Sequence, residues 1–158
     1  MTVRILIGSR LVAVALIALA AAAGAADAQL EVKNAWVRGT VQGQTATGAF
    51  MQLKSPAGGT LVGVASPAAG AAEIHAMRME GDLMRMRAVP QLDLPAGRTV
   101  ELTSGGYHVM LLDLKRALKK GDIVPIKLTL KGKDGTVQEI EVKAEVRDLT
   151  AAGGGMMH

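Results

Sequence analysis

The sequence predicts a single all-β domain, a sandwich or barrel of short strands. Three observations support this: alternating apolar segments recur at regular spacing, turn residues separate them, and the chain after residue 28 has a length that suits one domain. Alternation is clearest in residues 124–130 and 140–146, so each of these segments is expected to bury one face. Residues 114–120 are the only segment that invites a helical turn.

Nine strands are expected, and turn residues mark their order. Pro56–Gly59 separates the second strand from the third, and a short hairpin turn at Glu80–Asp82 separates the fourth from the fifth. Pro95–Gly97 precedes the sixth strand, the glycines at 105–106 open the seventh, and Lys133–Gly135 divides the last two. The expected strands are residues 30–38, 47–54, 60–65, 73–79, 83–89, 98–103, 107–113, 124–131 and 137–147.

Histidines and methionines alternate within three of these strands. Because residues i and i+2 of a strand point to the same face, His108 and Met110 should point the same way. The hairpin formed by the fourth and fifth strands should likewise place a His-Met-Met row beside a Met-Met row on one face of a ribbon. These two rows are His75, Met77 and Met79, followed by Met84 and Met86.

Two imidazoles and two thioethers in a chain without cysteine indicate copper. Thioether sulfur is a neutral, soft donor that favours Cu(I) and binds Zn²⁺, Mg²⁺ or Ca²⁺ poorly, whereas imidazole suits copper in either oxidation state. Thioethers also bind copper without losing a proton, and they cannot form disulfides in an oxidising compartment. The candidate metal ligands are His75, Met86, His108 and Met110.

The alternative is that the methionines are flexible core residues, as most methionines in folded domains are. Met51 lies in an apolar alternating run with no nearby histidine, so a core position is favoured for it. Met77, Met79 and Met84 could be either structural residues or auxiliary metal ligands. Both alternatives stay open, because Cu(I) needs only three or four donors.

The spacing of the four candidate ligands resembles the signature of the PCu(A)C-type periplasmic copper chaperones. His75 is followed by ten residues, Met86, twenty-one residues, His108, one residue and Met110. The resemblance covers roughly residues 30–148, and Ala76 departs from it, because some members have a further methionine there. It implies a cupredoxin-like Greek-key β-sandwich with these four residues as ligands. It also implies delivery of copper to the copper centre of a cytochrome oxidase subunit, together with a thiol-bearing assembly factor.

Three regions are expected along the chain. Residues 1–28 read as a cleavable secretory signal, with Arg4 and Arg10 before an apolar run too short for a typical membrane span and small residues at 26–28. Residues 29–149 form the copper-binding domain, which is expected in the periplasm. Residues 150–158 form a flexible tail whose Met156, Met157 and His158 are either auxiliary ligands, assisting a weaker Cu(II) site, or a terminus without function. The lack of cysteine argues against a lipid-modified cleavage site, and no stable membrane insertion is expected once the signal is cleaved.

Other function classes find little support. No cysteine nucleophile exists, the serines lack a local partner base, and no phosphate-binding loop is present, so an enzyme is not expected. The net charge is only +4, the lysines and arginines are scattered among acidic residues, and aromatic residues are scarce. Nucleic-acid binding is therefore not expected either. Two alternatives remain beside the chaperone: copper buffering without a dedicated acceptor, and a structural β-sandwich module with core methionines.

Overall fold

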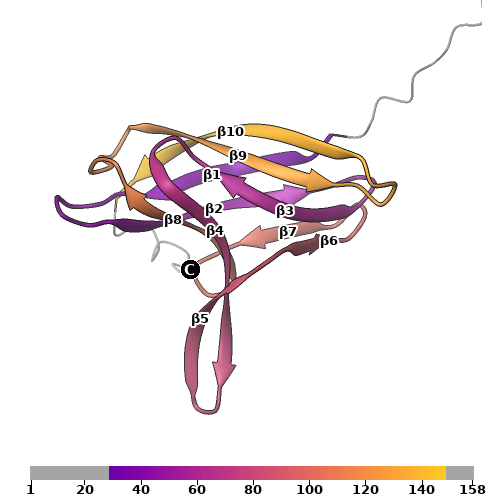
Figure 1. Ribbon diagram of the computed structural model, residues 1–158, viewed down its shortest axis with the longest axis horizontal. Helices are drawn as coiled ribbons and strands as arrows, with labels where there is room; N and C mark the ends of the chain where they lie inside the picture. Colours follow the sequence, from indigo (N-terminus) through magenta and orange to yellow (C-terminus); the bar gives the residue numbers. More distant parts are fainter. Residues whose placement is uncertain (1–28, 149–158) are drawn as a thin grey trace, which may run out of the picture.

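The computed structural model describes residues 29–148, which form ten strands (Figure 1). All ten belong to one hydrogen-bonded sheet in a single domain, which confirms the all-β prediction. The strands are β1 (Glu31–Arg38), β2 (Ala46–Lys54), β3 (Gly59–Ala65), β4 (Ala69–Glu80), β5 (Leu83–Val89), β6 (Leu92–Leu94), β7 (Thr99–Leu102), β8 (Tyr107–Leu114), β9 (Ile123–Lys131) and β10 (Val137–Arg147). Within this part of the chain, no helix is long and apolar enough to cross a membrane.

The strand order explains how distant segments meet. It runs β5-β4-β8-β2-β1-β10-β9-β3-β6, and β7 pairs with β2 beside β8. Neighbours are antiparallel except for β1 and β10, which run parallel. Strands β4 and β8 are therefore adjacent although about thirty residues separate them, and β5 lies at the outer edge of β4.

The core is formed by the alternating residues that the sequence predicts to be buried. In β9, Val124, Ile126 and Leu128 are fully buried while the residues between them face outward. In β10, Ala144 and Val146 are also fully buried, and the residue between them is exposed. Burying an aliphatic side chain contributes roughly 1.5–3 kcal/mol. Turning a strand over would expose all of its apolar side chains, so their period of two determines which face of each strand lies against the core.

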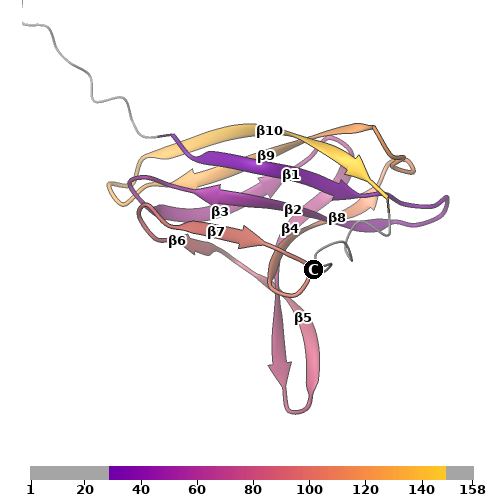
Figure 2. The same cartoon turned by 180° about the vertical axis from the view of Figure 1, so that it is seen from behind.

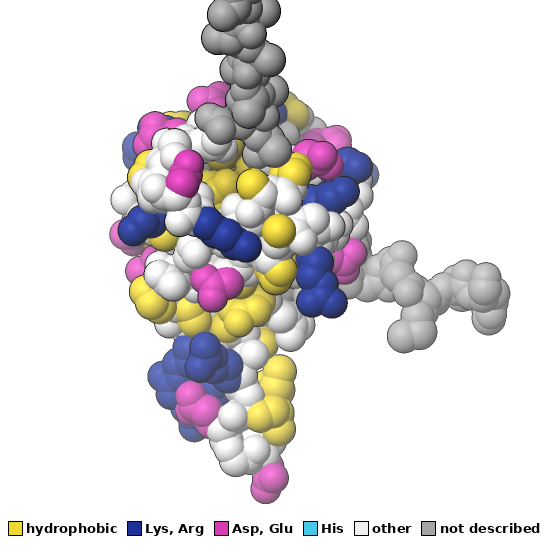
Figure 3. All heavy atoms as spheres, turned by 90° about the vertical axis from the view of Figure 1, so that its right-hand side faces the viewer, with side chains coloured by type: hydrophobic (Ala, Val, Ile, Leu, Met, Phe, Trp, Pro, Cys, Tyr) yellow, Lys and Arg dark blue, Asp and Glu magenta, His cyan; other side chains and the backbone are white. Residues whose placement is uncertain are grey.

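Strands β4 and β5 form a hairpin that extends beyond the body of the domain (Figures 1 and 2). Its turn includes Gly81, whose φ of +65° suits a residue without a side chain. Apolar side chains follow one side of this hairpin and charged side chains the other (Figure 3). The short hairpin turn predicted at residues 80–82 is thus confirmed.

Two strands differ from the sequence prediction by more than one residue. Strand β4 begins at Ala69 rather than residue 73, because its first residues pair with the far end of β8. The short β6 was not predicted; only three residues long, it pairs with β3 and buries Leu92 and Leu94.

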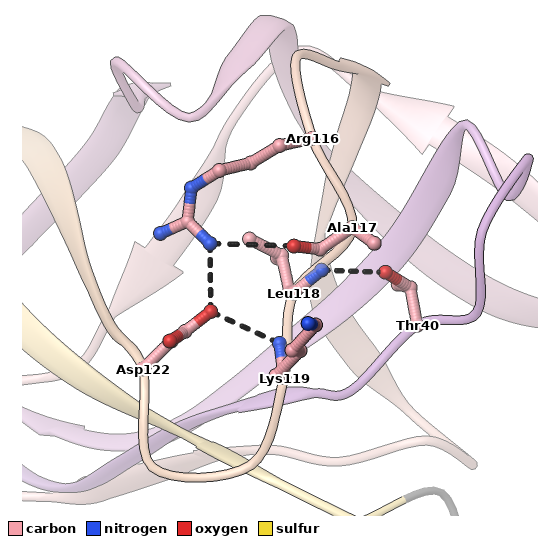
Figure 4. A network of polar contacts seen from close by, with 6 residues as sticks. All are labelled: Thr40, Arg116, Ala117, Leu118, Lys119 and Asp122. Atoms are coloured by element: carbon pink, nitrogen blue, oxygen red, sulfur yellow. Dashed lines mark hydrogen bonds and ion pairs between the residues drawn. The ribbon is translucent and has the colours of Figure 1, made fainter.

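The helical turn expected at 114–120 is also wrong (Figure 4). The backbone of Leu118 bonds to Thr40 instead: its N–H donates to Thr40 Oγ1 at 2.8 Å, and its carbonyl accepts from the Thr40 N–H at 2.8 Å. Asp122 accepts from Arg116 at 2.7 Å and from the Lys119 N–H at 3.0 Å. Burial of the Leu118 side chain in the core favours this extended path over a local helix.

Candidate metal centre

Three neighbouring strands bring the candidate ligands together. His75 on β4 lies directly opposite His108 on β8, and the centroids of their rings are 6.0 Å apart. On the other side of β4, Met86 of β5 lies opposite Met77. Directly opposed residues of antiparallel strands share a face of the sheet, so these side chains gather on one surface.

The shortest contact in this group joins Met86 to His108. Nε2 of the imidazole lies 3.0 Å from Sδ of the thioether, although 22 residues separate them in sequence. A nitrogen and a sulfur at this separation can both approach one metal ion. The Met86 side chain is 45% exposed whereas His108 is only 4% exposed, so the pair spans the boundary between solvent and the protein interior.

Both neighbours of the His108 ring can only accept a hydrogen bond: the Gly106 carbonyl lies 3.3 Å from Nδ1, and the Met86 thioether lies 3.0 Å from Nε2. The neutral ring therefore donates to one of them at a time. In the tautomer that donates to Gly106, Nε2 has a lone pair that faces Met86 and is available to a metal. Burial lowers the pKa of His108 below its ordinary 6.5, with the charges of His75 and Arg38 acting in the same direction and the Gly106 bond opposing them. This environment favours the neutral form that a metal requires.

His75 has the opposite arrangement. Its Nε2–H donates to Glu73 Oε2 at 2.8 Å, which leaves Nδ1 unprotonated in the neutral ring. Nδ1 is buried and has no hydrogen-bond partner within the described residues. A buried nitrogen with an unused lone pair is costly unless something binds it. Glu73 thus orients His75 as carboxylates orient metal-bound histidines in many proteins.

Met110 lies beside this group on β8, opposite Gly48 of β2. A side chain on Gly48 would meet the ring of Phe50, since its Cβ would lie 2.8 Å from Cζ. The Phe50 ring lies 6.2 Å from that of His108 and 4.6 Å from that of Trp36, centroid to centroid. These aromatic rings flank the histidine on the face of the sheet away from the core, with Arg38 over Phe50, and Gly48 leaves the space that Phe50 occupies.

A shallow hollow opens over Met86, His108 and Met110 and contains one of the auxiliary candidates, whereas His75 does not line it. Met77 lines it, although the sequence left a structural role open for that residue. Met79 and Met84 lie opposite each other farther out on the hairpin and are 61% and 52% exposed. The lining comprises Arg38, Gln44, Ala46, Thr47, Gly48, Phe50, Met77, Met86, Ser104, His108 and Met110.

The other residues considered in the sequence analysis lie away from the hollow or outside the described part of the chain. Met51 is 2% exposed and belongs to the core, as predicted, and it is the only buried methionine within residues 29–148. Ala76 is buried on the face opposite His75, so a methionine at this position would not reach the hollow by the same path. Met156, Met157 and His158 lie outside the described residues, as does the predicted signal segment.

Hard-ligand metal sites find no support in the described part of the chain. No three His, Cys, Asp or Glu side chains of residues 29–148 cluster closely enough to hold an ion. The side chains gathered near the two imidazoles are thioethers, and a mixed set of imidazole and thioether donors favours a soft ion.

Three contributors were missed from the sequence. Glu73 stands two residues before His75, a spacing that would place both on one face of a strand and could have identified it. Gly48 and Phe50 carry no such signal, because their role depends on pairing between β2 and β8.

Comparison with known proteins identifies the family of this chain. Residues 30–146 match the model of the LpqE-like family, "Putative lipoprotein LpqE-like". "Putative lipoprotein Lxx21020" of Leifsonia xyli subsp. xyli (strain CTCB07) is 34% identical over 126 residues, which cover 78% of this chain and 72% of that protein.

Solved structures extend the match to the PCuAC fold. The solution structure of CuI-DR1885 from Deinococcus radiodurans is 37% identical, with a TM-score of 0.58, covering 79% of this chain and 83% of that one. The apo PCuAC domain from PmoF1 is 25% identical, with a TM-score of 0.60, covering 75% and 93%. The copper-bound PCuAC domain from PmoF2, at 21% identity and a TM-score of 0.61 over 75% and 92%, shares the fold. This chain therefore belongs to the LpqE-like family, and its fold is that of the PCuAC domains.

Proposed function

We propose that this chain is a copper chaperone that binds one Cu(I) ion as its cargo. The observation that carries the proposal is the 3.0 Å approach of Met86 Sδ to Nε2 of His108, beside a second imidazole. The four ligands would be His75, Met86, His108 and Met110.

The chemistry of this donor set supports Cu(I) as the ion. All four donors are neutral when the imidazoles are unprotonated. They therefore supply none of the negative charge that a hard divalent cation favours in its ligands. The CuI-DR1885 protein, 37% identical to this chain, is described with Cu(I). Membership of a chaperone family also favours transport over catalysis.

Release would proceed by ligand exchange. The two imidazoles are held by hydrogen bonds to Glu73 and Gly106, whereas the Met86 thioether is exposed on the hairpin. An incoming donor would therefore displace the Met86 thioether first and the histidines last. We propose the copper centre of a cytochrome oxidase subunit as the acceptor, with a thiol-bearing assembly factor as a second partner.

We also propose that the protein acts in the periplasm. The family and its Leifsonia relative are described as lipoproteins, a class of exported proteins. The 158 residues contain no cysteine for a lipid, so the proposal rests on the secretory signal expected at residues 1–28.

Titration of the purified protein with Cu(I) against a chromophoric chelator tests the ligand assignment. Met86→Leu and Met110→Leu nearly conserve volume, so each should weaken Cu(I) binding by at least about tenfold, or about 1.4 kcal/mol, with the fold intact. Met51→Leu makes the same change in the core and should leave the affinity unchanged. A Met86→Leu/Met110→Leu protein that binds Cu(I) like the parent would refute the ligand set.

Transfer to an acceptor separates delivery from buffering. The Cu(I)-loaded chain should metallate a purified oxidase copper-centre subunit faster than an equal concentration of chelator-buffered Cu(I) does. A deletion strain should lose oxidase activity at limiting copper. Unchanged oxidase activity in that strain would favour the buffering alternative.

A further inference from the structure

The exposed face of the β4–β5 hairpin carries more thioethers than one copper site uses. Met77 lies opposite Met86, and Met79 lies opposite Met84, so two methionine pairs follow each other toward the tip. Directly opposed side chains have Cβ atoms about 4.5–5.5 Å apart, and diagonal neighbours remain within reach of long side chains. Four sulfur atoms can thus approach one another along this face.

Packing does not explain the outer pair. Met79 is 61% exposed and Met84 52% exposed, so neither fills a gap in the core. The hairpin also has a separate source of rigidity on its reverse face, where Arg87 makes two hydrogen bonds of 2.7 and 2.8 Å to Glu80. The methionine face is therefore free to serve another purpose than holding the hairpin together.

We propose that Met77, Met79 and Met84 form a second, thioether-only Cu(I) site on this face. Three neutral sulfur donors suffice for Cu(I) and leave harder ions without an adequate ligand. Methionine has three rotatable side-chain bonds, so exposed thioethers on neighbouring strands can turn toward one ion without moving the backbone. The inference rests on the proposed function, because it concerns the path of the same cargo.

The position of Met77 connects this site to the main one. Met77 lines the hollow beside His108 and stands opposite Met86, whose sulfur already approaches His108 Nε2 at 3.0 Å. An ion could pass from the outer thioethers to Met86 by exchanging one sulfur donor for the next. Copper stays Cu(I) throughout, and only coordination bonds form and break, so no oxidant or reductant is consumed.

Methyl NMR of the full chain, with Cu(I) added under anaerobic reducing conditions, tests the second site. The first equivalent should shift the methyl signals of Met86 and Met110. The second should shift those of Met77, Met79 and Met84. The Met79→Leu/Met84→Leu variant should lose the second equivalent and keep the first, whereas Met51→Leu should keep both.

The pH dependence distinguishes this site from any site in the tail. Thioethers have no proton to lose in this range, so occupancy of the hairpin site should be the same at pH 7.5 and pH 5.5. A site using His158 would weaken on acidification, because its imidazole must be neutral to bind.

The outcomes separate the two proposals. Methyl signals of Met79 and Met84 that stay at their apo positions through two equivalents would overturn this inference and leave the main site standing. A second equivalent that shifts only Met156 and Met157 would overturn it as well. A parent protein that binds no Cu(I) would overturn the proposed function together with it.

Discussion

Glu73 Oε2 lies 2.8 Å from Nε2 of His75, and the other nitrogen of that ring is buried without a partner. The carboxylate thus fixes which nitrogen of the proposed ligand is available. Removing such a partner typically weakens metal binding about 10–100-fold, so Glu73→Ala should weaken Cu(I) binding by about that factor. Competition with a chromophoric Cu(I) chelator measures it.

Two further variants show whether Glu73 acts by orientation. Glu73→Gln keeps an oxygen that can accept the Nε2–H bond, so it should retain much of the affinity that Glu73→Ala loses. Glu139→Ala removes an exposed carboxylate on β10 that pairs with Lys127, and it should leave Cu(I) affinity unchanged. Equal affinities for Glu73→Ala and the parent would mean that His75 needs no orienting partner.

The lowered pKa of His108 predicts how the stability of the apo protein depends on pH. The unfolded chain binds a proton at His108 below about pH 6.5, whereas the folded chain does so only at a lower pH. Between these two pKa values the unfolded state binds more protons, so the free energy of unfolding falls as pH falls. This contribution is present above pH 6.5 and is lost on acidification.

Urea denaturation of the metal-free protein between pH 7.5 and 5 measures this effect. His108→Gln removes the titrating group and should flatten the dependence in this window. Cu(I) affinity should also fall on acidification, since protons compete with copper for the imidazoles but not for the thioethers. A flat Cu(I) affinity between pH 7.5 and 5 would contradict histidine ligation.

Thr40 should stabilise the domain from a position outside the hollow. Its hydroxyl accepts the backbone N–H of Leu118, whose side chain is fully buried (Figure 4). Thr40→Val leaves that N–H without its acceptor, at a cost of about 1–3 kcal/mol, measurable by urea denaturation. Thr99→Val makes the same change at an exposed position on β7 and should cost much less. Loss of Cu(I) affinity in Thr40→Val would be unexpected, because the residue lies outside the hollow.

The tail is expected to affect capture rather than the main site. Met156, Met157 and His158 lie outside the described residues, and donors tethered to the domain would raise the local donor concentration near the main site. Deleting residues 153–158 should leave the first Cu(I) equivalent intact and reduce a weaker Cu(II) equivalent. Calorimetric titration with each ion tests this; loss of the first Cu(I) equivalent would place a main ligand in the tail.

Local periodicity predicted most of the fold and part of the arrangement of the candidate ligands. The alternation of His75, Met77 and Met79 with Met84 and Met86 predicted a one-sided row, and the pairing of β4 with β5 confirms it. This worked because a strand has a fixed period of two and a short turn determines the register of a hairpin.

The register between strands that are distant in sequence could not be predicted from local sequence patterns. That His75 lies opposite His108 depends on the pairing of β4 with β8, which the closure of the whole sheet determines. The expected helical turn at 114–120 failed for a related reason, since the bonding partner of Leu118 is Thr40, 78 residues away. Tertiary contacts of this kind override local helix preference.

The placement of the proposed ligands on paired strands also bears on how an acceptor could tell a loaded molecule from an empty one. Strands β4, β5 and β8 are held in register by backbone pairing, which no metal ligand takes part in, so only side-chain torsions need to change when an ion arrives. Loading would therefore order little backbone, and the outline presented to a partner would stay nearly the same. Discrimination would then depend on the exchangeable coordination bond itself, so an empty molecule would dock like a full one and act as a competitive inhibitor of delivery.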